Sequence, residues 1–283
     1  MPPPTEAFFM QISHLFIYPI KSCAAVEVER MDFDAFGPVG DRRYLIVDHD
    51  GRFLTQREHT DMAFIRPQLS REGIRLSGSG PRADVEPLDV VYPGSHERAP
   101  VTVWRDQMQA VDCGDAAAQW LSGFLGQECR LVCMPPDHDR PVNRSNAPGI
   151  AAGTQVVYAD GAPLLVVTED SVTALTNVAG LDVDVMRFRP NIVIREAGGA
   201  FAERGWQSLS TATGAHLQMI WPCERCVVPT RDPLTQQRTP EVMAALKDLC
   251  RIDGKIIFGQ NAVFSGQSLT VGEALTLPSG VSD

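Results

Sequence analysis

The sequence has little of what membrane insertion or export requires. None of its apolar runs approaches the ~18 residues that a membrane-spanning helix needs. No basic residue precedes Lys21, whereas a secretory signal or a transit peptide carries positive charge near its start. Seven cysteines are scattered along the chain with no leader before them, which is typical of reduced thiols. These absences predict a cytoplasmic protein with no membrane span.

Positive charge is also scarce. The chain has 25 lysines and arginines against 35 aspartates and glutamates, which gives a formal net charge of −10. A chain this acidic is a poor partner for nucleic acid or for an anionic membrane surface. Hydrophobic residues make up 44% and charged residues 21% of the 283 residues, as in ordinary globular proteins. This length predicts one large or two small domains with a core that needs no disulfides.

Glycine and proline are frequent, with 23 and 21 residues, and they separate many short apolar segments. This favours short strands over a helical bundle. Clear helical patterns are few, and they cover residues 115–125, 168–178 and 240–249. The sequence therefore predicts a mixed, β-rich α+β fold with helices at its periphery.

Residues 134–149 combine four prolines with interleaved Asp, Asn and Arg, which is typical of a loop. We place the boundary between two domains here, and predict that they span residues 10–135 and 136–280. Near the end of the chain, residues 268–277 alternate in polarity like a pair of strands around a glycine turn.

The sharpest local feature is the cysteine pair in Pro222-Cys-Glu-Arg-Cys226. Such a pair is a redox couple, half of a zinc site or two buried structural thiols. A redox couple opens a helix after a strand, whereas Val227 and Val228 predict a strand here. A zinc site needs two more ligands, and His216 is the only histidine nearby. A fourth alternative is one thiolate that binds a soft transition metal, with Arg225 lowering the pKa of that thiol.

Basic residues gather in Lys21-Ser22, in Asp41-Arg-Arg43 and in Arg187-Phe-Arg-Pro-Asn191. Each cluster alone is consistent with a solvated surface. In a chain of net charge −10, such clusters are also where an anion is held, because Arg presents a planar fork and Lys a point charge. We expect 187–191 to be extended, with both arginines on one face. The sequence has no GxGxxG, P-loop or GxSxG motif that would point to a nucleotide or a nucleophile elbow.

Taken together, six segments resemble the MOSC domain proteins, and more closely the bacterial relatives of the mitochondrial amidoxime reducing component. They stand in the order and at the spacing of that family, and they span nearly the whole chain, from about residue 12 to residue 277. The segments are Tyr18-Pro-Ile-Lys-Ser-Cys23, Asp41-Arg-Arg-Tyr-Leu-Ile-Val47, Asp112-Cys-Gly-Asp-Ala-Ala-Ala-Gln-Trp120, Arg187-Phe-Arg-Pro-Asn-Ile-Val-Ile194, Glu224-Arg-Cys226 and Phe258-Gly-Gln-Asn261.

The resemblance implies an N-terminal β-rich domain followed by a MOSC β-barrel domain. It implies the molybdenum cofactor, a pyranopterin dithiolene that holds molybdenum and carries a phosphate. The implied activity is an oxidoreductase reaction that reduces N-hydroxylated compounds. The implied partners are a small N-hydroxylated substrate and an external electron donor of the ferredoxin, flavoprotein or cytochrome type. The family association with pyridoxal phosphate binding comes with the resemblance as well.

The resemblance also assigns roles to single residues. Cys226 corresponds to the cysteine that ligates molybdenum and is the implied catalytic residue, whereas Cys223 corresponds to a cysteine that is not a ligand. The positions that correspond to cofactor binding, or that accompany it, are Lys21, Ser22, Arg42, Arg189, Asn191 and Arg225. An anionic cofactor is expected to draw Lys and Arg from separate segments, and molybdenum accepts a soft thiolate.

Three positions depart from the family pattern. Arg231 stands where a small apolar residue is usual, Ala162 replaces a Ser or Thr before a proline, and Asn261 replaces a Tyr. We expect these changes to leave cofactor binding in place and to affect the substrate. The chain ends at Asp283 without a further cysteine cluster, so we expect electrons to come from another protein. An alternative function is a non-catalytic carrier of the molybdenum cofactor or of sulfur.

Overall fold

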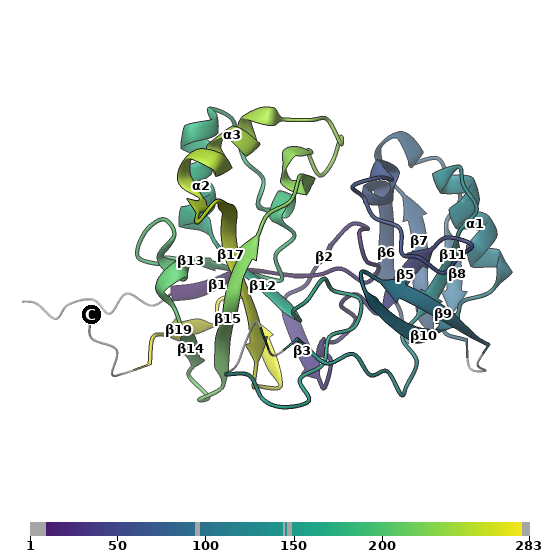
Figure 1. Ribbon diagram of the computed structural model, residues 1–283, viewed down its shortest axis with the longest axis horizontal. Helices are drawn as coiled ribbons and strands as arrows, with labels where there is room; N and C mark the ends of the chain where they lie inside the picture. Colours follow the sequence, from purple (N-terminus) through teal and green to yellow (C-terminus); the bar gives the residue numbers. More distant parts are fainter. Residues whose placement is uncertain (1–9, 94–96, 144, 146–148, 279–283) are drawn as a thin grey trace, which may run out of the picture.

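The computed structural model describes residues 10–93, 97–143, 145 and 149–278, and these residues form two lobes that lie side by side (Figure 1). One lobe is a closed barrel with two α-helices, and the other holds two small sheets and one α-helix. The predicted β-rich α+β fold with peripheral helices is confirmed. The chain start up to residue 9 and part of the loop predicted at 134–149 lie outside the described residues. No helix among the described residues is long and apolar enough to cross a membrane.

Seven strands close the barrel. β12 and β13 are parallel and are joined by helix α2 (Glu169–Ala179), and every other neighbouring pair in the ring is antiparallel. Buried aliphatic side chains of β1, β12, β13 and β17 fill its interior. The ring runs through β12 (Leu164–Thr168), β13 (Ile192–Arg195), β1 (Met10–Ile17), β19 (Ala274–Thr276), β14 (Ser208–Thr211), β15 (His216–Glu224) and β17 (Lys255–Phe264), which pairs again with β12.

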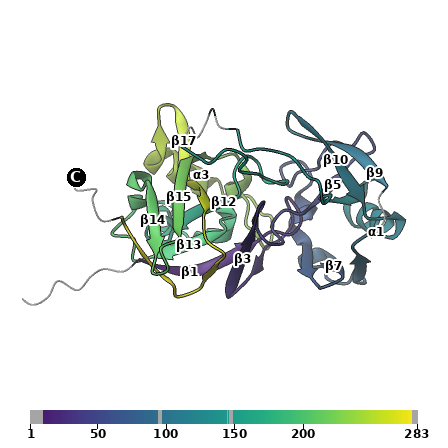
Figure 2. The same ribbon diagram turned by 90° about the horizontal axis from the view of Figure 1, so that it is seen from below.

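The first strand of the chain belongs to the barrel. β1 lies between β13 and β19, although it falls within the segment predicted for the first domain. The short strands β2 (Val26–Glu27), β3 (Arg30–Asp34) and β4 (Gly37–Pro38) follow it, and β3 lies between the two lobes in both views (Figure 2). The chain therefore starts in the barrel and then crosses to the other lobe. The predicted boundary at 135 and 136 stays a prediction.

The other lobe packs two sheets and one helix around one core, and a second buried cluster contains Leu45, Val101 and Tyr158. Helix α1 (Asp115–Leu125) covers this core with Leu121 and Phe124, both fully buried. One sheet is formed by β5 (Tyr44–Val47), β11 (Arg130–Cys133), β10 (Asp106–Asp112) and β9 (Arg98–Val103), and the other by β6 (Ile65–Leu69), β7 (Gly73–Gly78) and β8 (Leu88–Val91). The 3₁₀ helix η1 (Thr60–Phe64) connects the two sheets between β5 and β6, and η2 (Gly80–Arg82) lies between β7 and β8.

The three predicted helices are confirmed. α1 has the predicted bounds, and α3 (Pro240–Leu249) starts at its proline, whose missing N–H has no partner in the first turn of a helix. Thr168 caps α2, because its side chain accepts a hydrogen bond from the backbone N of Ser171 at 3.3 Å. Helices α2 and α3 pack together against the outside of β12 and β17, at the top of the barrel in Figure 1.

The segment Arg187–Asn191 is not extended, so that prediction is wrong. Residues Val185–Phe188 form the 3₁₀ helix η4, which Asp184 caps by accepting from the backbone N of Met186 at 2.8 Å. Arg189 then takes a left-handed conformation with φ of 56°. The two arginines consequently do not lie side by side on one strand face, and they make separate contacts.

Two further strand predictions are wrong. Val227 and Val228 do not form a strand, because Pro229 has no N–H for a sheet and the chain turns into η6 (Val228–Thr230). Residues 268–277 contain β18 (Ser268–Thr270) and β19, but these strands do not pair with each other. β18 pairs with β3, and β19 pairs with β1 and β14, because long-range partners complete the barrel. The remaining short elements are η5 (Ala202–Gly205) and β16 (Arg251–Ile252).

Candidate functional site

One cleft brings all seven of the sequence-predicted site residues together. It encloses about 940 Å³ up to its open mouth, and both lobes contribute to its walls. These seven predicted residues come from four separate segments of the chain. They are Lys21, Ser22, Arg42, Arg189, Asn191, Arg225 and Cys226.

The cleft is positively charged although the chain is strongly acidic. Its lining includes five cations, Lys21, Arg42, Arg57, Arg189 and Arg225, but only two carboxylates, Asp160 and Glu224. Because the whole chain has a net charge of −10, this excess of cations is a local feature and not a property of the general surface. Such a cleft attracts and holds an anion.

Two of the arginines stack on one buried tyrosine. The guanidinium carbons of Arg42 and Arg189 lie 4.3 Å and 4.2 Å from the centre of the Tyr18 ring. The Tyr18 hydroxyl donates to the carbonyl of Pro190 at 3.1 Å, and burial raises the pKa of this phenol, so it stays neutral. Arg189 also donates to the carbonyl of Cys23 at 2.8 Å. These contacts fix both guanidinium groups at the wall of the cleft.

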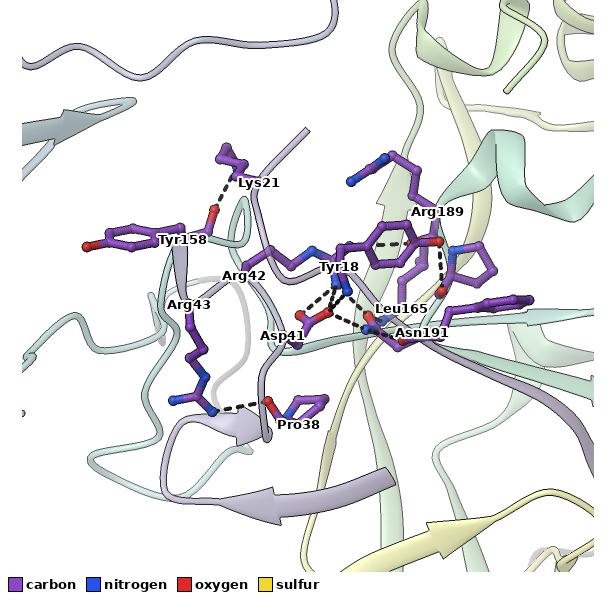
Figure 3. A network of polar contacts seen from close by, with 12 residues as sticks. Tyr18, Lys21, Pro38, Asp41, Arg42, Arg43, Tyr158, Leu165, Arg189 and Asn191 are labelled. Carbon is purple, nitrogen blue, oxygen red and sulfur yellow. Dashed lines mark hydrogen bonds and ion pairs between the residues drawn. The ribbon is translucent and has the colours of Figure 1, made fainter. Parts of the chain in front are cut away.

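Asn191 is the centre of a buried hydrogen-bond network (Figure 3). Its Oδ1 accepts from Arg42 at 3.0 Å and from the backbone N of Leu165 at 3.2 Å. Its Nδ2 donates to the carbonyl of Phe16 and to Oδ1 of Asp41, both at 3.1 Å. Both hydrogens of the amide are therefore used. The side chain connects β1, β12 and the turn that carries Arg42, and it leaves no free donor for a ligand.

Asp41 holds Arg42 from the other side. Its carboxylate accepts from Nη1 of Arg42 at 2.7 Å and from the backbone N of Tyr18 at 2.8 Å. Only 3% of the Asp41 side chain is exposed, so this is a buried ion pair in which further hydrogen bonds satisfy the carboxylate. Asp41 and Asn191 together therefore position Arg42.

Lys21 also lines the cleft, where it is buried and faces a carboxylate. Its ammonium donates to the carbonyl of Tyr158 at 2.8 Å and pairs with Asp160. Burial lowers the pKa of Lys21, and the charge of Asp160 opposes this effect. Trp104 donates to the same carboxylate at 3.1 Å. An ammonium has three donors, so Lys21 keeps one for a ligand.

The two cysteines of the 222–226 motif differ in environment. Cys226 is exposed in the cleft, which contradicts the alternative of two buried structural thiols. Arg225 donates to Sγ of Cys223 at 3.1 Å and to the carbonyl of Phe188 at 2.9 Å, so the guanidinium contacts the sulfur that the resemblance does not assign to the metal. Within the described ranges, no three His, Cys, Asp or Glu side chains form a metal-binding group.

The backbone around the cleft is strained. Eight non-glycine residues of the described chain have a positive φ, and four of them line this cleft: Ser22, Arg42, Trp104 and Arg189. Such conformations cost of order 1–3 kcal/mol each and persist where the surrounding structure imposes them. Three of the four are sequence-predicted site residues, so the fold holds these side chains in otherwise unfavourable positions.

Three further residues line the cleft that were not predicted from the sequence: Arg57, Trp104 and Asp160. Arg57 stacks on Trp104 at 4.7 Å, and both reach Asp160. The one local signal for a site here was the aromatic residue Trp104, which is 44% exposed in the turn between β9 and β10. Of the three positions that depart from the family pattern, Ala162 and Asn261 line this cleft and Arg231 does not.

Two protein-family models match the sequence. One is described as the MOSC N-terminal beta barrel domain and matches residues 9–128, and the other is described as the MOSC domain and matches residues 153–276. The chain belongs to the MOSC domain proteins that combine these two domains.

The similar curated proteins are of two kinds. A molybdenum cofactor sulfurase of Danio rerio is 33% identical over 264 residues, which cover 88% of this chain and 31% of the sulfurase. The chain thus spans about a third of the length of that relative. Mitochondrial amidoxime-reducing component 1 of Mus musculus is 29% identical over 262 residues, which cover 89% of this chain and 76% of that protein. Among solved structures, the YuaD protein of Bacillus subtilis aligns over 94% of both chains, with 10% identity and a TM-score of 0.39. None of these names refers to pyridoxal phosphate.

Proposed function

We propose that this chain binds the molybdenum cofactor in the cleft and reduces N-hydroxylated compounds with electrons from a separate redox protein. The observation that carries the proposal is the convergence of five cations and the exposed thiol of Cys226 in one cleft of a MOSC protein. The similarity to an amidoxime-reducing component over 89% of this chain supports the type of reaction.

The residues in the cleft suit this cofactor. Its phosphate needs cationic donors, and Arg189 and Lys21 both keep N–H groups that are not used within the structure. Nε of Arg225 is buried and has no hydrogen-bond partner among the described residues, as expected for a wall that faces a polar ligand. Cys226 supplies the soft sulfur ligand that molybdenum accepts.

We assign the following roles to the residues of this chain. Lys21, Ser22 and Arg189 bind the phosphate of the cofactor, and Cys226 ligates the metal as a thiolate. Asn191 and Asp41 position Arg42, because their own hydrogen bonds are already used. The cofactor, when bound, supplies the two-electron chemistry that removes oxygen from nitrogen.

A second candidate function is transfer or storage of the cofactor or of sulfur, without reduction of a substrate. The similarity to molybdenum cofactor sulfurases favours it, because those proteins contain a region like this chain. Both candidates require cofactor binding. Reduction of benzamidoxime by the loaded protein with an artificial electron donor separates them, since a carrier leaves this substrate unchanged.

Protein purified from a molybdenum-sufficient host is expected to contain about one molybdenum and one pterin per chain, because the cleft offers one cationic wall and one exposed thiol. Elemental analysis and the fluorescence of the acid-released pterin measure both. Stoichiometric zinc without pterin would contradict the proposal. Loading the purified chain with isolated cofactor is the control for a host in which cofactor supply is limiting.

The Arg189→Ala variant is expected to retain less cofactor than the wild type. A hydrogen bond to a charged group contributes about 1.5–3 kcal/mol, which corresponds to a roughly ten- to hundredfold lower affinity. Arg52→Ala is the control, because Arg52 is exposed in an isolated bridge to Thr102 and does not line this cleft. The measurement is the molybdenum content of both variants after loading with limiting cofactor. Equal contents would count against the assignment of Arg189.

A further inference from the structure

A second cavity lies beside the candidate cofactor cleft. It encloses about 800 Å³ up to its open mouth and shares Gln56, Arg57, Arg189 and Val228 with the cleft. Its walls also include Tyr18 and Val227, and Val227 directly follows Cys226 in the chain. The second cavity therefore adjoins the cleft, close to the proposed metal ligand.

Five arginines line the second cavity, against a single carboxylate. The arginines are Arg57, Arg66, Arg187, Arg189 and Arg231, and the carboxylate is Asp184. Asp184 already accepts a hydrogen bond from the backbone N of Met186 as the cap of η4. The cavity thus has a large excess of positive charge that its own lining does not neutralise.

Most of these guanidinium groups keep unused donors. Arg187 pairs with Asp232 at 3.2 Å, and Arg57 approaches Asp160 at 3.8 Å. Arg66, Arg189 and Arg231 form no salt bridge with any carboxylate in the described part of the chain, and bond instead to a hydroxyl or to backbone carbonyls. The cavity therefore offers three cations without a charged partner in the described chain, and Arg66 and Arg231 remain so when Arg189 binds the proposed cofactor.

One buried donor gives a further sign of a missing partner. Arg187 is only 5% exposed, and its Nε has no hydrogen-bond partner among the described residues. The other two nitrogens of this guanidinium bond to the carbonyl of Pro229 and to Asp232, so only Nε lacks a partner. A buried N–H of this kind usually faces a ligand or ordered water. This observation is independent of the count of charges.

Much of the remaining wall of the cavity is apolar. Ala24, Ala25, Ala63 and Met186 line it, and Val227 and Leu234 are 58% and 61% exposed. A free phosphate ion gains nothing from such surface, whereas an organic anion buries its apolar body there. Because arginine forks and aliphatic side chains lie in one cavity, the cavity favours a ligand that has both a negative charge and an apolar body.

We propose that the second cavity binds an amphipathic organic anion, a carboxylate on an apolar body, and that it holds the organic part of the N-hydroxylated substrate. The first half of this proposal stands on the cavity alone. The second half rests on the proposed function, because it needs the reaction to occur at Cys226. The preferred substrates are then N-hydroxylated compounds that carry a carboxylate away from the reacting nitrogen.

The binding half is tested with 4-phenylbutyrate and its neutral isostere 4-phenylbutyramide, titrated calorimetrically into the full chain. The carboxylate is expected to bind at least about tenfold more tightly, because a charge-assisted contact to arginine is lost in the amide. Equal affinity for the two probes would overturn the proposal. Inorganic phosphate that competes as strongly as 4-phenylbutyrate would overturn it too, because the site would then recognise charge alone.

Variants on one hairpin give the matched control. Arg66→Gln is expected to weaken 4-phenylbutyrate binding about tenfold, whereas Arg71→Gln on the exposed turn of the same β6–β7 hairpin should leave it unchanged. Arg231→Gln from the other lobe should weaken it similarly, which guards against a folding defect in one variant. Wild-type binding in both Arg66→Gln and Arg231→Gln would show that the anion does not occupy this cavity.

The substrate half is tested with the loaded protein and two amidoximes, benzamidoxime and an analogue with a carboxylate on a short spacer. The acidic analogue is expected to have the lower KM, and Arg66→Gln should remove this advantage without a matching fall in kcat. Equal KM values would overturn the substrate assignment. Failure to turn over either compound would overturn the proposed function together with the substrate assignment. The calorimetric titration tests anion binding in the second cavity independently of turnover.

Discussion

Replacing Cys226 with serine should abolish the reduction of N-hydroxylated compounds and leave the fold intact. The side chain is exposed at the cleft and supports no core contact, so serine has little effect on stability. Its hydroxyl is harder and far less acidic than a thiol, which makes it a poor replacement for a soft thiolate ligand. Lys21 and Arg189 remain in place, so much of the pterin binding should remain as well. Turnover per bound molybdenum is the quantity to measure.

Cys223→Ser is the matched control, and it should be much milder. Cys223 accepts a hydrogen bond from Arg225, and a serine oxygen can accept the same bond. The expected cost is about 1 kcal/mol of folding stability, the usual size for a partly buried substitution. A redox-pair mechanism instead predicts equal loss in both variants. Such an equal loss, or normal turnover in Cys226→Ser, would refute the assignment of Cys226 as the metal ligand.

Local chemistry made the helices predictable. The side chain of Thr168 caps α2 by accepting a bond from Ser171, and Pro240 begins α3. The first residues of α2 and α3 could therefore be predicted from the sequence. The barrel could be expected only from the resemblance. β1 and β13 pair across about 180 positions of sequence, as in Gln11 opposite Arg195, and no local pattern specifies a partner at that distance.

The conformation of Arg187–Asn191 shows how tertiary contacts override a local pattern. Alternating residue types indicated an extended segment, but Asp184 caps a 3₁₀ turn here. Arg189 then takes a left-handed conformation because its guanidinium stacks on Tyr18 and bonds to the carbonyl of Cys23. Those partners lie more than 160 residues away in sequence. The identity of the site residue was predictable, and its geometry was not.

The residues that form the walls of the cleft were also only partly predictable from the sequence. The seven predicted residues meet there because their motifs are recognisable together, although each basic cluster alone is consistent with a solvated surface. Arg57, Trp104 and Asp160 were missed because they reach the cleft from turns and connections without a motif of their own. The folding of two lobes against each other is what places them beside Lys21.

Asn191→Ala should be among the most destabilising single substitutions in this chain. Asn191 is 1% exposed, and its amide makes four hydrogen bonds to β1, to β12 and to the turn of Asp41 and Arg42. Alanine removes all four bonds, so the backbone N of Leu165 loses this acceptor, whereas Arg42 and Asp41 keep their bond to each other. At about 1–3 kcal/mol for each buried group that loses a partner, we expect a loss of at least about 3 kcal/mol. For a protein of this size that lowers the midpoint of thermal unfolding by roughly 6–12 °C.

The matched control for Asn191 is Asn177→Ala, on the exposed face of α2, where alanine is the better helix former and should leave the unfolding midpoint nearly unchanged. Asn191→Asp is the more discriminating variant. It keeps the shape of the side chain but removes the two donors and brings a second carboxylate next to Asp41, 3.1 Å from Nδ2 in the native structure. Because like charges that close repel in a buried site, Asp should destabilise at least as much as Ala. If either Asn191 variant unfolds within about 2 °C of the wild type, less than the shift expected for 1 kcal/mol, the hydrogen bonds of Asn191 to β1, β12 and the turn of Arg42 do not stabilise the fold as proposed.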